Sequence, residues 1–128
     1  MKITEIKSQS NLYLKWGKEC FGWGVFTDST IKSGDVVETC YCLIDNYDKA
    51  PYKDYAYHPD INTQDVYHCL GFGAIYNHSD SPNIVWKMID NERSLIQFYV
   101  LRDIEAGEQL YHSYGKDYWI NRGKKSLI

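Results

Sequence analysis

Short apolar stretches, separated by Gly, Asp, Asn and Pro, run along this chain, and the clearest of them alternate apolar and polar positions. Successive side chains of a β-strand point to opposite faces, so a period of two predicts strands. The strongest candidates are residues 36–44 and 95–101, and residues 110–114 and 24–26 are shorter ones. In the first of these, Glu38, Cys40 and Cys42 share one face, and Val37, Thr39 and Tyr41 share the other.

Helical periodicity is weak by comparison. Residues 52–57 are expected to form one or two helical turns after Pro51, and residues 65–76 a short helix in spite of Gly71 and Gly73. The pattern therefore predicts a mostly β fold with small helical inserts.

One internal repeat stands out. Residues 31–37 and 104–110 share an apolar anchor, a polar turn closed by glycine, an acid and the start of a strand. Gly34 and Gly107 occupy equivalent places, and we expect both to adopt positive φ where the chain reverses. Two copies predict two equivalent turns, whereas a solenoid would need roughly three or more repeats.

The composition is that of an ordinary globular protein. The 128 residues fit one domain, with 44% hydrophobic and 24% charged residues. A net charge of −3 argues against a dedicated DNA-binding protein, which normally carries a basic stripe. No stretch has the length and apolarity of a signal peptide or a membrane span, so we expect a soluble, intracellular protein.

Tyrosine and cysteine refine this picture. The twelve tyrosines suit either a pocket that is apolar at one end and wet at the other, or the strand faces of a β-rich protein. The cysteines at positions 20, 40, 42 and 69 form no C-x-x-C pair, so we expect buried free thiols. No metal site is predicted.

Three segments carry groups suited to chemistry, and each has a plainer interpretation. Residues 21–26 flank Trp23 with two glycines, which lets backbone approach a ligand or simply forms a turn. Residues 74–83 gather Asn, His, Ser and Asp, as a binding segment or a polar loop would. Residues 107–114 end in Tyr114, which is followed at once by glycine, so its hydroxyl lies at a strand end or the ring packs in the ordinary way.

Together, these segments resemble the SET-domain family of protein-lysine methyltransferases. The motifs that carry the resemblance are Gly22-Trp23-Gly24, similar to the first cofactor motif, Asn77-His78-Ser79-x-x-Pro82-Asn83, similar to the asparagine–histidine motif, and Gly107-Glu108-Gln109-Leu110-x-x-x-Tyr114, similar to the catalytic-tyrosine motif. Their order and spacing also fit, and the likeness runs from about residue 17 to residue 119. The nearest likeness is to the small stand-alone SET proteins of large algal viruses, which are histone-lysine methyltransferases.

The resemblance implies a fold and an organisation. The expected fold is mostly β, with several small β-sheets, short helices and a C-terminal pseudoknot. Residues 1–128 would form a single SET domain with no zinc-binding module before or after it. Small members of the family dimerise, so a homodimer is possible.

The resemblance also implies roles for individual residues. Tyr114 would be the catalytic residue at the point of methyl transfer. The cofactor, S-adenosyl-L-methionine, would be bound by Gly22, Trp23, Gly24, Asn77, His78 and Trp119, the last stacking on adenine. The channel for the substrate lysine would include Tyr55, Tyr118 and His112. The family sets the number of methyl groups by a Tyr or Phe in the channel, and His112 and Trp86 occupy the two corresponding positions, so product multiplicity stays open. His112 is equally compatible with a plain strand histidine.

The chemistry of methyl transfer to lysine can be considered independently. Only the neutral amine is nucleophilic, and neutralising a lysine of pKa near 10.4 at pH 7 costs roughly 4–5 kcal/mol. A narrow aromatic channel removes water from the ammonium and can lower its pKa by up to about 3–5 units. A tyrosine hydroxyl can orient the amine in line with the methyl group.

Three hypotheses follow. The first is a methyltransferase acting on a histone-tail lysine, in the nucleus of a host cell or in the cytoplasm; the second is the same enzyme acting on a non-histone protein. The third is a catalytically silent module that binds the cofactor or a peptide. Each expects a protein or peptide partner, and none expects direct nucleic-acid or membrane binding.

Overall fold

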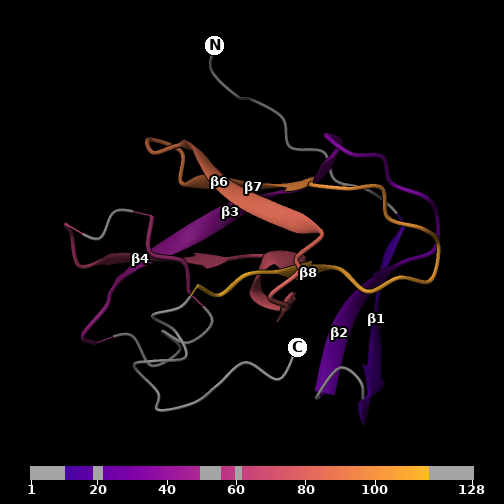
Figure 1. Ribbon diagram of the computed structural model, residues 1–128. Helices are drawn as coiled ribbons and strands as arrows, with labels where there is room; N and C mark the ends of the chain where they lie inside the picture. The colour runs from indigo at the N-terminus through magenta and orange to yellow at the C-terminus, as the bar shows by residue number, and fades with distance from the viewer. Residues whose placement is uncertain (1–10, 19–21, 50–55, 60–61, 116–128) are drawn as a thin grey trace.

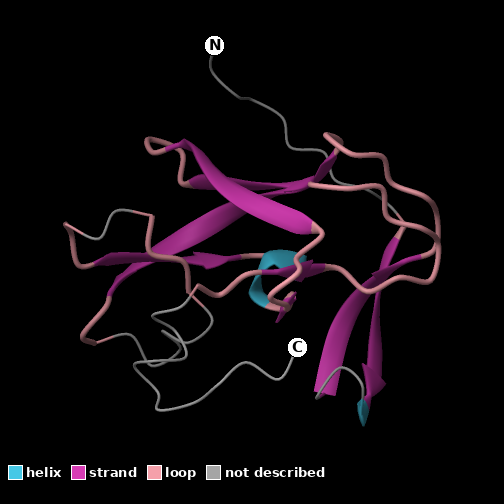
Figure 2. Ribbon diagram, in the orientation of Figure 1, coloured by secondary structure: helices cyan, strands magenta, loops and turns pink. Residues whose placement is uncertain are grey.

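The computed structural model describes residues 11–18, 22–49, 56–59 and 62–115 (Figure 1). Its strands are β1 (Leu12–Gly17), β2 (Gly22–Thr27), β3 (Val36–Asn46), β4 (Asp65–Cys69), β5 (Asn77–His78), β6 (Ile84–Asp90), β7 (Leu95–Val100) and β8 (Tyr111–His112), and the 3-10 helix η3 (Phe72–Ala74) follows β4. They form a four-stranded sheet and two two-stranded sheets (Figure 2). The predicted strands therefore exist, and the described fold is mostly β.

The four-stranded sheet carries most of the core. Its order is β4-β3-β7-β6, and all of its neighbouring strands are antiparallel. Phe98 at its centre is fully buried, which contributes about 1.5–3 kcal/mol relative to an exposed side chain. The face of β3 predicted from Glu38, Cys40 and Cys42 is buried, and Tyr41 is exposed. Val37 is buried as well, because the register with β7 shifts between Val36 and Glu38.

The β1–β2 hairpin stands apart from this sheet (Figure 1). Its strands pair from Leu12 with Thr27 to Gly17 with Gly22. Val25 is fully buried on the hairpin face that meets the core, whereas Trp16 and Trp23 at the far end are exposed and meet edge to face. The hairpin thus joins the core at one end and presents aromatic rings to solvent at the other.

The two repeated turns pair with each other. The backbone groups of Ile31 and Ile104 exchange two hydrogen bonds of 2.8 Å. Gly34 N–H donates to the carbonyl of Val100, and Gly107 N–H donates in the equivalent way to Thr27. The φ angles of the two glycines are 87° and 91°, which confirms the predicted positive φ. The repeat is therefore a local pseudo-two-fold arrangement, and it ties the start of β3 to the segment that leads to β8.

One helix prediction is confirmed only in part, and the other falls mostly outside the described residues. Residues 65–76 hold only the short 3-10 helix η3, and their first part is β4. Val66 and Cys69 are buried, because pairing with β3 selects the extended form. Of residues 52–57, Tyr57 forms an extended bridge with Tyr67, and residues 52–55 lie outside the described residues.

The predicted C-terminal pseudoknot stays a prediction, since residues 116–128 also lie outside the described part. Strands β1, β5 and β6 were not anticipated from the pattern. In the described part of the chain, no helix is long and apolar enough to cross a membrane. The described cysteines, Cys40, Cys42 and Cys69, are buried and free, as expected.

Candidate active site

The asparagine–histidine segment and the tyrosine segment lie side by side. Asn77 pairs with Tyr111 and His78 with His112 in the parallel sheet of β5 and β8. Beyond this pairing, Ser79 N–H donates to the carbonyl of His112 at 3.0 Å. Parallel strands need a long connection, and the segment between β5 and β8, which contains the β6–β7 hairpin, provides it. Two motifs about thirty residues apart thereby become one site.

Asn83 anchors this pairing from the start of β6. Its side chain is 1% exposed, and its Nδ2 donates to the carbonyl of Gln109 at 2.8 Å. Its Oδ1 accepts the N–H of Tyr111, also at 2.8 Å. The buried amide of Asn83 therefore pairs with the backbone carbonyl before Leu110 and the backbone N–H after it, as a neighbouring strand would.

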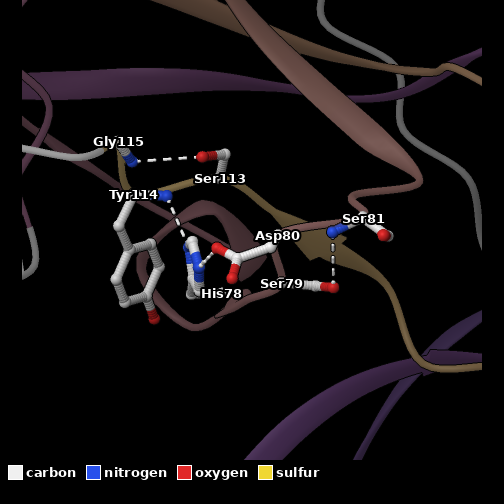
Figure 3. Close-up of polar contacts among 7 residues, drawn as sticks. All are labelled: His78, Ser79, Asp80, Ser81, Ser113, Tyr114 and Gly115. Carbon is white, nitrogen blue, oxygen red and sulfur yellow. Dashed lines mark hydrogen bonds and ion pairs between the residues drawn. The ribbon is translucent and has the colours of Figure 1, made fainter. Parts of the chain in front are cut away.

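His78 links the two segments through its side chain (Figure 3). Its Nδ1 accepts the backbone N–H of Tyr114 at 2.8 Å, and its Nε2 lies 2.8 Å from Asp80 Oδ1. A backbone N–H can only donate, so Nδ1 carries the lone pair and Nε2–H donates to the carboxylate. The imidazole is thus held in one tautomer, and it fixes the backbone of Tyr114.

Tyr114 is also held at its hydroxyl, which donates to the carbonyl of Tyr76 at 3.1 Å. Its ring centroid lies 5.1 Å from that of His78 and 5.0 Å from that of His112. After it, Gly115 adopts a φ of 87°, and its N–H donates to Ser113 Oγ (Figure 3). The positive φ of Gly115 thus allows the backbone to change direction directly after the tyrosine.

A buried carboxylate supports Tyr76. Glu38 is 4% exposed; its Oε1 accepts the Tyr76 hydroxyl at 2.7 Å, and its Oε2 accepts the Phe72 N–H at 2.9 Å. Burial raises the pKa of Glu38, and these hydrogen bonds oppose that effect only in part. Glu38 thereby ties β3 to η3 and to the residue whose carbonyl receives the Tyr114 hydroxyl.

His112 lies within a group of aromatic rings. It is 6% exposed, and burial lowers its pKa to about 4, so it is neutral at pH 7. Its Nε2 lies 3.4 Å from the hydroxyl of Tyr57, which itself donates to the carbonyl of Gly73 at 2.6 Å. Burial also raises the pKa of Tyr57. His112 Nδ1 has no hydrogen-bond partner among the residues that the structure describes.

The Gly22-Trp23-Gly24 motif lies next to Asn77. The Nδ2 of Asn77 donates to the carbonyl of Trp23 at 3.1 Å, so β2 touches the asparagine–histidine segment directly. Gly22 has a φ of 124°, a conformation that other residues rarely adopt. The structure thus brings together seven of the predicted site residues: Gly22, Trp23, Gly24, Asn77, His78, His112 and Tyr114. Tyr55, Tyr118 and Trp119 lie outside the described residues.

Three residues of the site were missed in the sequence. Glu38 was assigned only to a strand face, and Tyr57 to a helical turn. Gln109 lies inside the tyrosine motif, but nothing in its spacing indicated its contact with Asn77. The aromatic surroundings of Tyr57 come from β6, β7 and β8, as its contacts with Trp86, Phe98 and His112 show. Only the folded chain assembles these contacts.

No metal centre is found in the described part of the chain, where no group of three or more His, Cys, Asp or Glu side chains could hold an ion. Cys42 and Cys69 are register partners with sulfurs 3.4 Å apart. Their neighbourhood is apolar core, and hydrogen bonding to the other thiols together with burial raises the pKa of Cys69. These thiols therefore pack as small apolar side chains.

Solved structures share this arrangement. A candidate histone methyltransferase of Plasmodium falciparum superposes with a TM-score of 0.73 at 26% identity, covering 87% of this chain and 98% of that one. KRYPTONITE, solved with mCHH DNA, an H3(1–15) peptide and SAH, superposes with a TM-score of 0.70 at 18% identity over 85% of this chain and 24% of its own. The latter likeness shows the fold alone. The chain thus has the β-rich fold found in these proteins.

The SET domain family model matches residues 22–115, and the chain belongs to this family. The predicted SET-domain fold is confirmed. The Schizosaccharomyces pombe protein "Histone-lysine N-methyltransferase, H3 lysine-37 specific" is 44% identical over 50 residues, which is 39% of this chain and 33% of that protein. The matched stretch thus spans about a third of the length of this relative.

Proposed function

We propose that this protein is a protein-lysine N-methyltransferase that uses S-adenosyl-L-methionine and acts on a lysine of a histone tail. The observation that carries the proposal is the position of Tyr114. It is held at its N–H by His78 and at its hydroxyl by the carbonyl of Tyr76, directly beside the Asn77 segment. A tyrosine held at both its backbone and its hydroxyl suits a reaction that depends on alignment.

The residues around Asn77 fit the proposed cofactor. The backbone of β2 at Gly22 and Gly24 and the side chain of Asn77 would hold its methionine end, and the backbone at His78 its adenine. Asn77 and Trp23 are already in contact, so these groups form one continuous wall. The bound cofactor would supply an electrophilic methyl group on a sulfonium. Trp119 is proposed to cover the adenine, and Tyr55 and Tyr118 to line the lysine channel.

The surroundings of Tyr114 suit a lysine that must lose its charge. His112 is neutral at pH 7, so it adds no positive charge beside the entering ammonium. The rings of Tyr57, Tyr114 and His112 exclude water, which favours the neutral amine. Aromatic faces still attract the entering cation by about 0.5–2 kcal/mol. The Tyr114 hydroxyl would orient the amine, and His112 would occupy the position that sets the number of methyl groups.

A histone substrate is favoured by the relatives. The fission yeast protein is named for lysine 37 of H3, and KRYPTONITE was solved with an H3 peptide. A non-histone substrate is the second candidate, because the net charge of −3 favours any cationic peptide equally. A silent binding module is disfavoured, since Asn77, His78 and Tyr114 are all retained and the His78 side chain accepts the Tyr114 N–H.

The activity can be tested with labelled cofactor and core histones. We expect transfer by the wild-type protein and a loss of at least about 100-fold in Tyr114→Phe, because the orienting hydroxyl is gone. Tyr41→Phe is the matched control: Tyr41 is half exposed on the outer face of β3 and should be dispensable. Equal transfer by wild type and Tyr114→Phe would contradict the proposal.

The finer proposals need separate measurements. If no histone is labelled, methylated lysines identified by mass spectrometry in a treated lysate would favour the non-histone substrate, and cofactor binding without any turnover would favour the silent module. A homodimer is proposed because the chain resembles small stand-alone viral SET proteins, and small members of the family dimerise. A monomeric mass by light scattering under assay conditions would contradict it.

A further inference from the structure

Cys42 and Cys69 form a pair of buried thiols in the four-stranded sheet. They are register partners on β3 and β4, 27 residues apart along the chain, and both are free. Their sulfurs lie 3.4 Å apart, in hydrogen-bond contact, and the two residues are 1% and 3% exposed. Two thiol groups therefore face each other directly across neighbouring strands.

The backbone around this pair has the geometry that a disulfide requires. The N–H of Cys42 points away from β4 and donates to the carbonyl of Ser94 at 2.8 Å. On the other side of β3, the N–H of Leu70 donates to the carbonyl of Tyr41 at 3.0 Å, so the hydrogen bonds flank the cysteine pair. Opposite residues in such a position have Cα atoms about 4.5 Å apart, within the range of about 4.4–6.8 Å found for disulfides. The sulfurs need to approach by about 1.4 Å to form a bond of about 2.0 Å.

The two thiols are not equivalent in acidity. The hydrogen bond from Cys69 lowers the pKa of Cys42, whereas hydrogen bonds to Cys40 and Cys42, together with burial, raise the pKa of Cys69. The thiolate is the nucleophile in thiol oxidation. Cys42 is therefore the thiol that reacts first with an oxidant, and Cys69 lies in contact with the sulfur that has reacted.

The position of β4 provides access to the pair. This strand has five residues and lies at the edge of the four-stranded sheet, beside β3 (Figure 1). A short strand with one partner in its sheet opens locally at a lower free energy than the central strands. Local opening of β4 exposes both sulfurs to a small oxidant such as hydrogen peroxide.

We infer that Cys42 and Cys69 form a redox-modification site, at which hydrogen peroxide closes a reversible disulfide between β3 and β4. The Cys42 thiolate first attacks a peroxide oxygen, which breaks the O–O bond, forms a sulfenic acid and releases hydroxide. Cys69 gives its proton to that hydroxide, and its sulfur displaces a second hydroxide from the Cys42 sulfur. The two thiols thereby lose two electrons, and the peroxide is reduced to two molecules of water once the Cys42 proton is counted.

The link would hold β4 against β3 and close the chain segment between the two cysteines. A disulfide that closes a loop of this length restricts the unfolded chain, so Tm should rise by about 5–15 °C. Disulfides of intracellular proteins are usually transient. Dithiothreitol should therefore open the link again and return Tm to its starting value.

The test is to treat the folded, reduced protein with hydrogen peroxide at neutral pH, then unfold it, alkylate the remaining thiols and analyse it by mass spectrometry. We expect a monomeric product that has lost two hydrogen atoms and is alkylated at two of its four cysteines. The peptide map should show Cys42 linked to Cys69. The same treatment in urea is the reference, because an unfolded chain pairs its cysteines without this preference.

Substitutions identify the sulfurs that react. Cys42→Ala and Cys69→Ala should each abolish the link. Cys40→Ala is the matched control: Cys40 is equally buried on the same face of β3, and its removal should leave the link between Cys42 and Cys69 intact.

Four outcomes would overturn the inference. They are oxidation without any intramolecular link, a dominant link through Cys20 or Cys40, the same distribution of pairs in folded and urea-unfolded protein, and a fall in Tm when the link forms. If the variants do not fold, the peptide map of the wild-type protein still decides, because it identifies the linked cysteines directly.

Discussion

His112 makes the stability of this protein depend on pH in a way that can be isolated. Burial lowers its pKa in the folded protein to about 4, with a smaller contribution from the nearby His78, whereas the ordinary value is 6.5. Between these values the unfolded chain binds a proton that the folded protein does not. The contribution of His112 to the free energy of unfolding therefore rises with pH through this window. It is lost as the pH falls from about 6.5 to about 4.

The size of the effect follows from the two pKa values. They differ by about 2.5, and each unit corresponds to about 1.4 kcal/mol, so the loss on acidification is about 3 kcal/mol. His112→Phe removes the proton site while keeping an aromatic ring beside Tyr57 and Tyr114. The hydroxyl of Tyr57 keeps its acceptor at Gly73. Between pH 7 and pH 4, the free energy of unfolding of the variant should thus fall by about 3 kcal/mol less than that of the wild type.

The measurement is urea unfolding followed by tryptophan fluorescence at several pH values from 7 to 4. Glu38 acts in the opposite direction, because burial raises its pKa and its contribution to the free energy of unfolding falls as the pH rises above 4.5. This effect is the same in wild type and in His112→Phe. His58→Gln serves as the control, because it removes a histidine from the surface and leaves His112 in place. If wild type and His112→Phe lose the same free energy on acidification, the assigned burial effect is wrong.

Three further substitutions test the packing and hydrogen bonding around the site. Gly73→Ala should lower the free energy of unfolding by about 1–3 kcal/mol, because a Cβ there would lie 2.7 Å from the Cβ of Cys69; an unchanged urea midpoint would refute this crowding. Tyr76→Phe leaves the buried Glu38 without its hydroxyl donor and should cost about 1–3 kcal/mol at pH 7 by the same method. Asn83→Ala leaves the Gln109 carbonyl and the Tyr111 N–H without their side-chain partner, so it should lower Tm by more than Tyr76→Phe does. A smaller decrease would show that water replaces the amide.

How far the sequence predicts the fold depends on the length of each element. Residues 36–44 and 95–101 alternate over enough positions to identify β3 and β7. The predicted shared face of Glu38, Cys40 and Cys42 proves to be buried. Residues 65–69 are too short for periodicity to separate strand from helix, and pairing with β3 decided the outcome. The bulge at Val36 was also invisible, since it depends on the partner strand.

The same division applies to the candidate site. The motifs around Asn77 and Tyr114 could be recognised because they are local runs of residues with a fixed spacing. Glu38 and Tyr57 reach the site from other parts of the chain, and a single sequence does not show which distant residues will meet. Gln109 stood inside a motif, but its orientation depends on a carbonyl of β2.

By itself, the sequence determined a mostly β chain, the two equivalent turns at Gly34 and Gly107, and the two segments that carry the candidate chemistry. These are properties of local periodicity, backbone freedom at glycine and runs of adjacent residues. Only the tertiary structure decided that His112 is buried and neutral and that Tyr114 is held at two points. A pKa and a hydrogen-bond geometry are set by the groups that surround a side chain, and those groups come together only when the chain has folded.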